Sequence, residues 1–395
     1  MKTTGVAIVL CLNVGTDPPD IVKPTPCARM ECWKNTMGVY RTKAAEEIGN
    51  ALQMQYEKWQ SKAKYKLCLD TTPDELRRVA YGLRKTARSD RLLVHYNGHG
   101  VPKPTANGEL WVFGRNLTHY APLPVSELCN WFGRPSVYVL DCSAAGLLLP
   151  FFLEDTQTGE TVAIQTPSQT RSTSGTGSGR DSSRTPSTSL HALDGHTMVL
   201  AACRADEILP MNPNYPADIF TACLTTPIRM ALWWFVLQNP YSMKGIDPDI
   251  ASHLPGKDND RKTPRGELNW IFTAITDTIA WSTLPRDVFQ KIFRQDLLVA
   301  SLFRNFLLAR RIMKSFNCHP QSHPPLSDAI CHHKLWHAWD LAVESAVLRA
   351  DGVRRGSISN AVRPSPSPFF TENLTAFEVW LDFGGFLEES PPHLP

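Results

Sequence analysis

Four short apolar runs recur along this chain, and segments with helical spacing separate them. The runs lie within GVAIVLCLNV (5–14), RLLVHYNGHG (91–100), SVYVLD (136–141) and HTMVLAACRADEILP (196–210). A continuous apolar run is typical of a strand covered on both faces, and strand–helix–strand alternation favours a parallel sheet. We therefore expect an α/β fold, with a mostly parallel sheet and helices on both of its faces.

Helical patterns are present throughout the chain and dominate its second half. The segment 43–62 has apolar residues at helical spacing, and 71–88 begins with a Thr cap and acids and ends with basic residues, as a dipole-matched helix does. Further helices are expected at 122–133, 216–238, 266–281, 285–315 and 334–350. In 285–315 the basic residues fall mostly between the apolar positions, which favours a solvated helix face over a nucleic-acid footprint.

Composition narrows the class of protein. The 41 Lys and Arg residues nearly balance the 38 Asp and Glu residues, so the net charge of +3 gives no general attraction to nucleic acid or anionic membrane. The ten Cys residues are scattered and mostly sit inside apolar runs, which indicates reduced thiols. No apolar segment is long enough to span a bilayer. We expect a cytoplasmic protein that binds no nucleic acid, inserts into no membrane and needs no cofactor, since no phosphate-binding loop occurs.

Two segments differ from the rest. Residues 156–190 are rich in Ser, Thr and Gly and predict a disordered insertion, and 320–327 is a Pro-rich linker before the next helix. The last segment, LTAFEVWLDFGGFLEESPPHLP, contains a further apolar helix, which suggests that more protein follows.

The clearest chemical candidates are His99 and Cys142. His99 lies in NGHG after one predicted strand, and Cys142 follows the next strand, in VYVLDCSAAG. Neighbouring parallel strands end at the same edge of a sheet, so the segments that carry His99 and Cys142 are expected side by side. A His beside a Cys can remove the thiol proton and create a nucleophile. The alternative is that His99 stabilises a loop and Cys142 is part of the core.

A metal site is a weaker candidate. Cys and His residues gather in the Pro-rich loop and the next helix: Cys318, His319, His323, Cys331, His332, His333 and His337. Their gaps match no standard zinc finger, because zinc usually takes short paired spacings. We therefore assign no metal.

The order of these segments resembles that of caspases and metacaspases. There, apolar strands lead to a His-Gly, then to an Asp-x-Cys block, then to a third strand that ends near a substrate-contacting residue; Asp206 would match that residue. Metacaspase-like proteins read D-S-C-H-S-G where this chain reads D-C-S-A-A-G, so Ser143, and not Cys142, holds the position of the nucleophile. A one-residue shift turns Cys142 to the other face of the strand. The sequence identifies no orienting carboxylate, so the dyad positions are interpreted as vestigial.

Longer blocks resemble the raptor family, the regulatory proteins of the TOR kinase complex. They include CLNVGTDPPD, KPTPCARMECW, HYNGHGVPKPTANGELWVFGRNLTHY, LDCSAAG, PADIFTACLTTPI and RKTPRGELNWIFTAITDTIAW. The resemblance implies a caspase-like three-layer sandwich over residues 1–320, with the insertion at 156–190, followed at 321–395 by a linker and the first helices of an α-solenoid.

The family resemblance also implies a function. The leading hypothesis is a non-catalytic scaffold of TOR kinase complex 1 that recruits protein substrates and presents them to the kinase in the control of cell growth. The rival is a cysteine hydrolase with His99 as base and Cys142 as nucleophile, and a zinc-stabilised adaptor is the third hypothesis.

Overall fold

The computed structural model describes residues 2–36, 38–115, 119–153 and 197–355, which fall into two compact units. The first comprises residues 1–218, 290–299 and 318–326, and the second comprises 219–289, 300–317 and 327–395. The predicted insertion at 156–190 and the apolar helix predicted in the last segment lie outside the described residues. The predicted division after residue 320 stays a prediction.

A six-stranded sheet is the centre of the first unit. Its neighbours pair in parallel, except that the last edge strand is antiparallel. This confirms the mostly parallel α/β sheet expected from the apolar runs. In spatial order the strands are β4 (Lys64–Leu69), β1 (Thr3–Leu10), β5 (Arg91–Asn97), β8 (Ser136–Asp141), β9 (Thr197–Ala201) and β10 (Gln321–His323).

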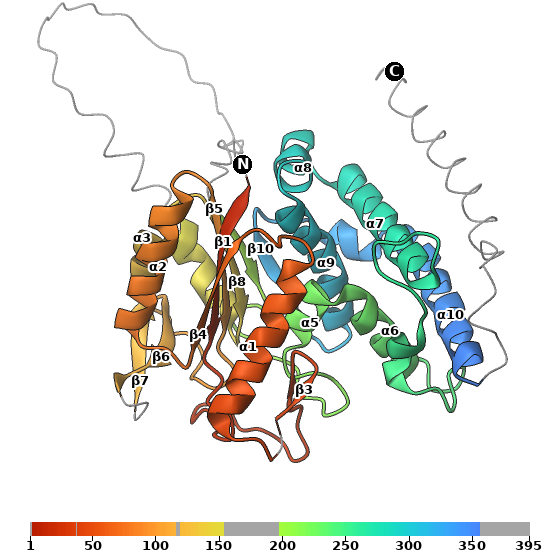
Figure 1. Ribbon diagram of the computed structural model, residues 1–395, viewed down its shortest axis with the longest axis horizontal. Helices are drawn as coiled ribbons and strands as arrows, with labels where there is room; N and C mark the ends of the chain where they lie inside the picture. Colours follow the sequence, from red (N-terminus) through yellow and green to blue (C-terminus); the bar gives the residue numbers. More distant parts are fainter. Residues whose placement is uncertain (1, 37, 116–118, 154–196, 356–395) are drawn as a thin grey trace, which may run out of the picture. The chain divides into compact units, whose positions relative to one another are not determined.

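Helices cover both faces of this sheet, so the first unit has three layers. Figure 1 shows α1 (Arg41–Glu57) on one face, with α2 (Pro73–Ala87) and α3 (Val125–Phe132) on the other. The predicted cap of α2 is present, because Thr72 accepts a hydrogen bond from the Glu75 amide while the Glu75 side chain accepts one from the Thr72 amide.

Two local predictions were wrong in part. The helix expected over 122–133 begins at Val125, because the residues before it form β7 (Tyr120–Pro124). This strand pairs antiparallel with β6 (Glu109–Phe113) in a hairpin. The linker expected at 320–327 contains β10, whose backbone pairs with the free edge of β9. A three-residue strand is too short to show alternation, so only the tertiary structure reveals it. A second small hairpin joins β2 (Met30–Glu31) and β3 (Lys34–Asn35).

The described part of the second unit is helical. Within it the Arg311 guanidinium lies 5.6 Å from the ring centre of Trp234 and 5.0 Å from that of Trp336, and it bonds both carboxylate oxygens of Asp340. This contact ties three helices of the unit together. Its helices are α5 (Ile219–Thr225), α6 (Pro227–Gln238), α7 (Pro264–Thr283) and α10 (Leu335–Arg354), with the short 3-10 helices η3 (Pro248–His253) and η4 (Asp328–His332); α8 (Arg286–Phe293) and α9 (Leu297–Lys314) each have residues in both units.

A buried ion pair fixes the segment 290–299 to the sheet of the first unit. Arg91, at the start of β5, lies 3.4 Å from Asp296, and their side chains are 1% and 2% exposed. Asp296 also accepts hydrogen bonds from the Thr3 hydroxyl and from the Leu298 amide. A buried charge pair is favourable only when further hydrogen bonds of this kind satisfy it.

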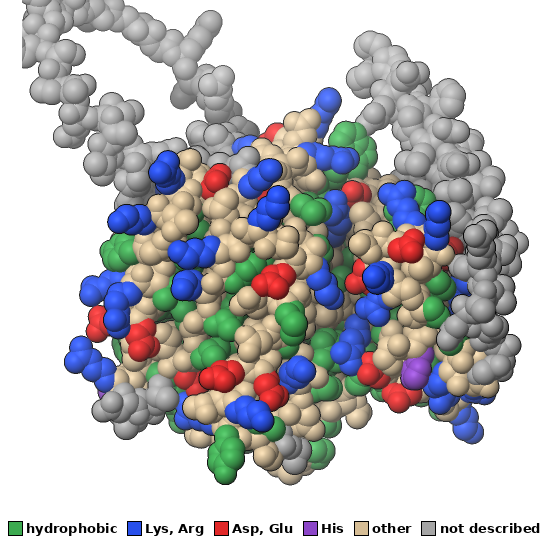
Figure 2. Space-filling view, viewed as in Figure 1, with side chains coloured by type: hydrophobic (Ala, Val, Ile, Leu, Met, Phe, Trp, Pro, Cys, Tyr) green, Lys and Arg blue, Asp and Glu red, His purple; other side chains and the backbone are tan. Residues whose placement is uncertain are grey.

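One face of the molecule shows charges of both signs. On the face drawn in Figure 2, Lys and Arg side chains are interspersed with Asp and Glu. Within the described ranges, no helix is both long and apolar enough to cross a membrane.

Because the Arg91–Asp296 pair is buried, we expect substitution of Asp296 to lower the stability of the fold strongly. Asp296→Ala leaves the Arg91 charge buried without its partner, so we expect it to lower the free energy of unfolding by about 3–5 kcal/mol. Urea denaturation followed by circular dichroism measures this. Arg115→Ala, which removes a largely exposed ion pair with Asp74, is the control and should cost less than about 1 kcal/mol. Equal losses for the two variants would contradict the prediction.

Candidate functional site

The ends of β5 and β8 bring the two predicted site segments together. Asn97 and Asp141 are partners in the parallel register of these strands, and the Gly98 amide donates to the Asp141 carbonyl at 2.9 Å. His99 therefore lies beside the end of β8. The expectation that His99 and the Asp-Cys-Ser segment meet at one sheet edge is confirmed.

Two constraints shape the loop that carries His99. The Gly100 amide donates to the Cys11 carbonyl, and a Cβ atom at Gly100 would lie 2.0 Å from the Leu12 carbonyl carbon, so only glycine allows this close approach. The loop that follows β1 is held in turn by Asp70, which accepts hydrogen bonds from the Leu12 and Asn13 amides and pairs with Arg41.

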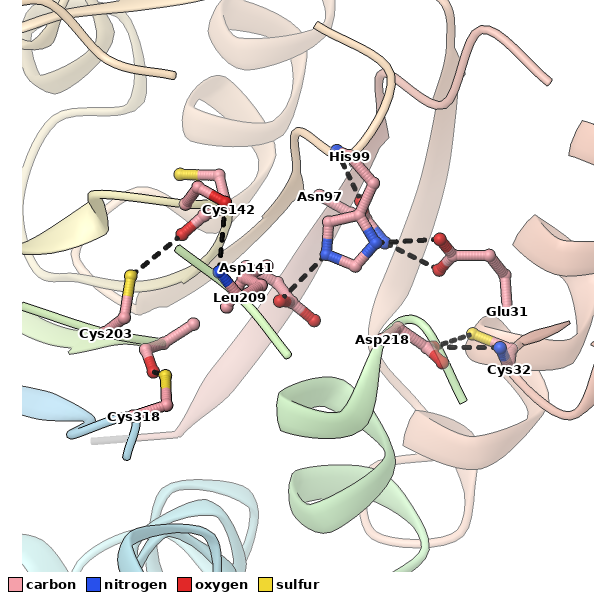
Figure 3. A network of polar contacts seen from close by, with 12 residues as sticks. Glu31, Cys32, Asn97, His99, Asp141, Cys142, Cys203, Leu209, Asp218 and Cys318 are labelled. Carbon is pink, nitrogen blue, oxygen red and sulfur yellow. Dashed lines mark hydrogen bonds and ion pairs between the residues drawn. The ribbon is translucent and has the colours of Figure 1, made fainter. Parts of the chain in front are cut away.

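His99 lies between two carboxylates, as Figure 3 shows. Its Nδ1 is 2.7 Å from Glu31 Oε1 and its Nε2 is 3.1 Å from Asp141 Oδ1. Asn97 donates from its side-chain amide to Glu31 Oε2 and accepts from the His99 amide. Asn97 and Asp141 are fully buried, and the side chains of His99 and Glu31 are 11% and 10% exposed. We call Glu31, His99 and Asp141 the ion cluster.

The ion cluster sets the protonation state of His99. Burial alone lowers the pKa of the imidazole, but the charges of Glu31 and Asp141 and their hydrogen bonds together outweigh burial and raise the pKa well above 6.5. Each ring nitrogen faces a carboxylate, so both act as donors in the charged ring. A histidine in this state has no free nitrogen with which to accept a proton from a nucleophile.

Asp218 extends the negative side of the cluster. It is fully buried, and its Oδ2 accepts hydrogen bonds from the Cys32 amide at 2.8 Å and the Cys32 thiol at 3.3 Å. Burial, followed by the charges of Glu31 and Asp141, raises the pKa of Asp218 well above its ordinary value. A neutral acid at this position avoids a third buried negative charge.

Cys142 does not face this cluster. Figure 3 shows its thiol directed away from His99, and the side chain is 2% exposed. Burial, followed by the nearby Cys203 and Asp141, raises the pKa of the Cys142 thiol well above 9. The Cys203 thiol donates to the Cys142 carbonyl at 3.4 Å. Cys142 therefore has the environment of a core cysteine, which is inert as a nucleophile.

Ser143 lies on the side of the strand end that faces His99. Both residues line one cavity, and Cys142 does not line it. The Ser143 hydroxyl oxygen accepts a hydrogen bond from the Leu209 amide at 3.1 Å. The sequence register thus corresponds to the geometry: the position after Cys142 points into the site.

The cavity in front of the ion cluster has a volume of about 420 Å³ and belongs wholly to the first unit. Its walls come from the loop after β1, the segment around β2 and β3, the His99 loop and the segment around Leu209. We call it the His99 cavity. Asp206, suggested as a substrate-contacting acid, is exposed and does not line it.

The structure describes all seven residues of the candidate metal cluster. His319 bonds to Glu207, the His332 ring faces Lys314, and the His333 ring accepts from the Leu335 amide. In the described ranges, no group of three or more His, Cys, Asp or Glu residues is arranged to hold a metal ion.

Sequence reasoning missed Glu31, Asp141 and Asp218 as members of the site. Asp141 was visible beside Cys142, but its side-chain direction was not. Glu31 and Asp218 are far from His99 in sequence, and their only sequence signal is that they lie in the blocks ARMECW and PADIF.

Comparison with known proteins identifies the fold. Residues 1–152 match the family described as "Raptor N-terminal CASPase like domain". These residues carry the N-terminal caspase-like domain of the raptor family. The resemblance drawn from the sequence blocks is thereby confirmed, as is the caspase-like fold class.

Relatives of this chain match it well beyond that domain. "Regulatory-associated protein of TOR 1" of Arabidopsis thaliana is 50% identical over all of this chain and 27% of its own length, and "Protein raptor homolog" of Dictyostelium discoideum is 48% identical over all of this chain and 29% of its own. The crystal structure of Chaetomium thermophilum Raptor has a TM-score of 0.81 and 45% identity, covering 99% of this chain and 32% of that one. The chain thus spans less than a third of these relatives.

The ion cluster predicts how the free energy of unfolding depends on pH. Because the folded-state pKa of His99 is raised, its contribution to stability is fully present below about pH 6.5, the unfolded pKa, and is lost as the pH rises through the folded pKa. We expect His99→Gln to lower the free energy of unfolding by about 3–5 kcal/mol near pH 6, and by less under alkaline conditions. Urea denaturation across this pH range measures the difference. A loss that stays constant or grows with pH would contradict the assignment.

Proposed function

We propose that this chain is part of a non-catalytic scaffold of TOR kinase complex 1, which recruits protein substrates and presents them to the kinase in growth control. The observation that carries the proposal is similarity over the whole chain to proteins named as regulatory-associated proteins of TOR or as subunits of target of rapamycin complex 1. "Regulatory-associated protein of TOR 1" is one, and "Target of rapamycin complex 1 subunit mip1" of Schizosaccharomyces pombe is 44% identical over all of this chain and 29% of its own length.

The chemistry of the site supports a role without catalysis. A base must have a free lone pair, but both ring nitrogens of His99 face carboxylates at 2.7 and 3.1 Å. Ser143 occupies the nucleophile position with its oxygen already accepting from the Leu209 amide. The carboxylates that would orient a catalytic histidine instead hold this one in its charged form. We infer that the dyad positions His99, Cys142 and Ser143 are vestigial.

The lack of disulfides among the cysteines supports a cytoplasmic location. None of the ten forms a disulfide, and eight of them are buried. Disulfides are rare in reducing compartments, so a chain whose ten cysteines form no disulfide is suited to the cytoplasm.

Purification of the protein from its own cells tests the scaffold proposal. With an affinity tag on the natural gene, we expect the TOR kinase to co-purify and to be identified by mass spectrometry. Asp296→Ala, which breaks the buried ion pair of the first unit, serves as the fold-disrupted control and should retain less kinase. Absence of the kinase from the well-folded unmodified protein would overturn the proposal.

The rival cysteine hydrolase predicts a reactive Cys142, and we expect the opposite. Burial and the raised pKa of the thiol should make Cys142 react with iodoacetamide at neutral pH more slowly than the partly exposed Cys27 of the same chain, and His99→Ala should not slow it further. Peptide mass spectrometry of the native protein gives both rates. Fast labelling of Cys142 that depends on His99 would restore the hydrolase.

A further inference from the structure

The strand β4 (Lys64–Leu69) is one edge of the six-stranded sheet, because it pairs with β1 and is the terminal strand in the spatial order. Just beyond β4, the Asp70 amide donates to the Leu10 carbonyl of β1 at 2.7 Å. Alternate residues of a strand direct their backbone groups to the same neighbour. The even-numbered residues of β4 therefore bond to β1 as Asp70 does, and the odd-numbered residues direct their N–H and C=O groups outward.

The outward backbone groups of β4 belong to Tyr65, Leu67 and Leu69. Within the described ranges, no hydrogen bond to these N–H and C=O groups is present. The strand β6 bonds the chain beyond β4 and not β4 itself, through the Phe113 amide and the Thr71 carbonyl. A strand edge with free N–H and C=O groups is a template on which a further extended segment can pair.

A run of lysines follows this edge. Four lysines and no acid lie between Glu57 and Asp70, and among the described residues none of the four is in an ion pair. We call them the Lys row; all four are exposed, and they are Lys58, Lys62, Lys64 and Lys66. Lys64 and Lys66 are two residues apart in β4, so their side chains lie on the same face of the strand.

Two acids act on residues of β4, and both already have hydrogen-bond donors. Glu57 accepts a hydrogen bond from the Gln53 side chain at 2.7 Å. Glu75 accepts hydrogen bonds from the Thr71 hydroxyl and the Thr72 amide. The Lys row is therefore a cluster of positive charge without its own counter-charge, and it attracts an anionic partner.

Charge and backbone together select the occupant of this edge. A second copy would bring the same lysines to the junction, and like charges on neighbouring strands are destabilising. A lipid surface would pair with the lysines but leave the outward N–H and C=O groups of β4 without partners. An extended acidic polypeptide supplies a partner for both.

We propose that β4 binds an extended acidic segment of a partner protein as an additional strand, with carboxylates of that segment on Lys64 and Lys66. Carboxylates at alternate positions of the segment fit, because residues two apart share a face of a strand. This edge is separate from the His99 cavity, since no residue of β4 lines that cavity. The binding does not rest on the scaffold role.

Fluorescence anisotropy with the full chain tests the charge of the partner. The probes are a labelled Thr-Glu-Thr-Glu-Thr-Glu-Thr peptide and a counterpart with Lys in place of Glu. We expect the Glu peptide to bind at least about ten-fold more tightly than the Lys peptide at low salt, and to weaken as salt is added. Equal binding of the two peptides, or a preference for Lys, would overturn the proposal.

Two further peptides test the strand pairing without any change to the protein. One carries N-methyl groups on all Glu amides of the Glu peptide, and the other carries them on all Thr amides. Because alternate N–H groups of a strand face opposite sides, only one of these peptides loses the donors directed at β4. That peptide should bind about ten-fold more weakly than the other. Equal binding of the two, whether strong or weak, contradicts the pairing.

Substitution of the Lys row locates the binding. The double variant Lys64→Glu, Lys66→Glu should weaken binding of the Glu peptide by about ten-fold and strengthen binding of the Lys peptide. The matched control is Lys34→Glu, Lys43→Glu, which changes two exposed lysines outside the Lys row and alters the net charge equally. Equal losses in the two double variants would show a general attraction of charge and overturn the site.

Vesicles that contain phosphatidylserine test the lipid alternative. We expect the Lys64→Glu, Lys66→Glu variant to bind them as the unmodified chain does. Vesicle binding that requires these two lysines, together with no binding of the Glu peptide, would assign the Lys row to a lipid surface and overturn the proposal. Because no kinase takes part in these measurements, their outcome is independent of co-purification.

Discussion

Two carboxylates bind one buried histidine, and this contact sets the charge and the arrangement of the site at the edge of the sheet. Glu31 and Asp141 come from β2 and β8, and His99 comes from the loop after β5, so the ion cluster joins three segments at the carboxyl edge of the sheet. None of these charges could be buried alone, because an unpaired ion in a protein interior costs several kcal/mol. Each member therefore requires the other two, and the loop positions around the His99 cavity depend on all three.

The same interaction separates this site from the catalytic one that its fold resembles. A catalytic histidine needs one nitrogen oriented by a partner and the other free for the nucleophile. Here the second nitrogen faces Asp141, and the thiol of Cys142 is packed in the core beside Cys203. The sequence identified no carboxylate partner for His99, but the structure has two. The second one faces the ring nitrogen that a general base would need.

Much of the first unit was predictable because its signals are local. Apolar runs gave the four central strands, and the Thr72 cap marked the start of α2 to within a residue. The short strands β7 and β10 were harder to predict. Tyr120–Pro124 contains two prolines, which local patterns assign to a helix start but which an edge strand also tolerates. Gln321–His323 becomes a strand only because β9 offers a free edge for pairing.

By itself the order of residues determined the mostly parallel α/β sheet and the meeting of the His99 loop with the Asp-Cys-Ser segment, since strand periodicity and parallel order follow from it. The resemblance to the metacaspase block is what placed Ser143 in the nucleophile position. Only the tertiary structure decided that His99 has two acidic partners, that Asp218 lies near them, and that Arg29 lines the His99 cavity. Glu31 and Asp218 are 68 and 119 residues away from His99, and no local pattern fixes a contact over such separations. Burial and long-range packing bring them together, and with that they set the charge on which the chemistry of the site depends.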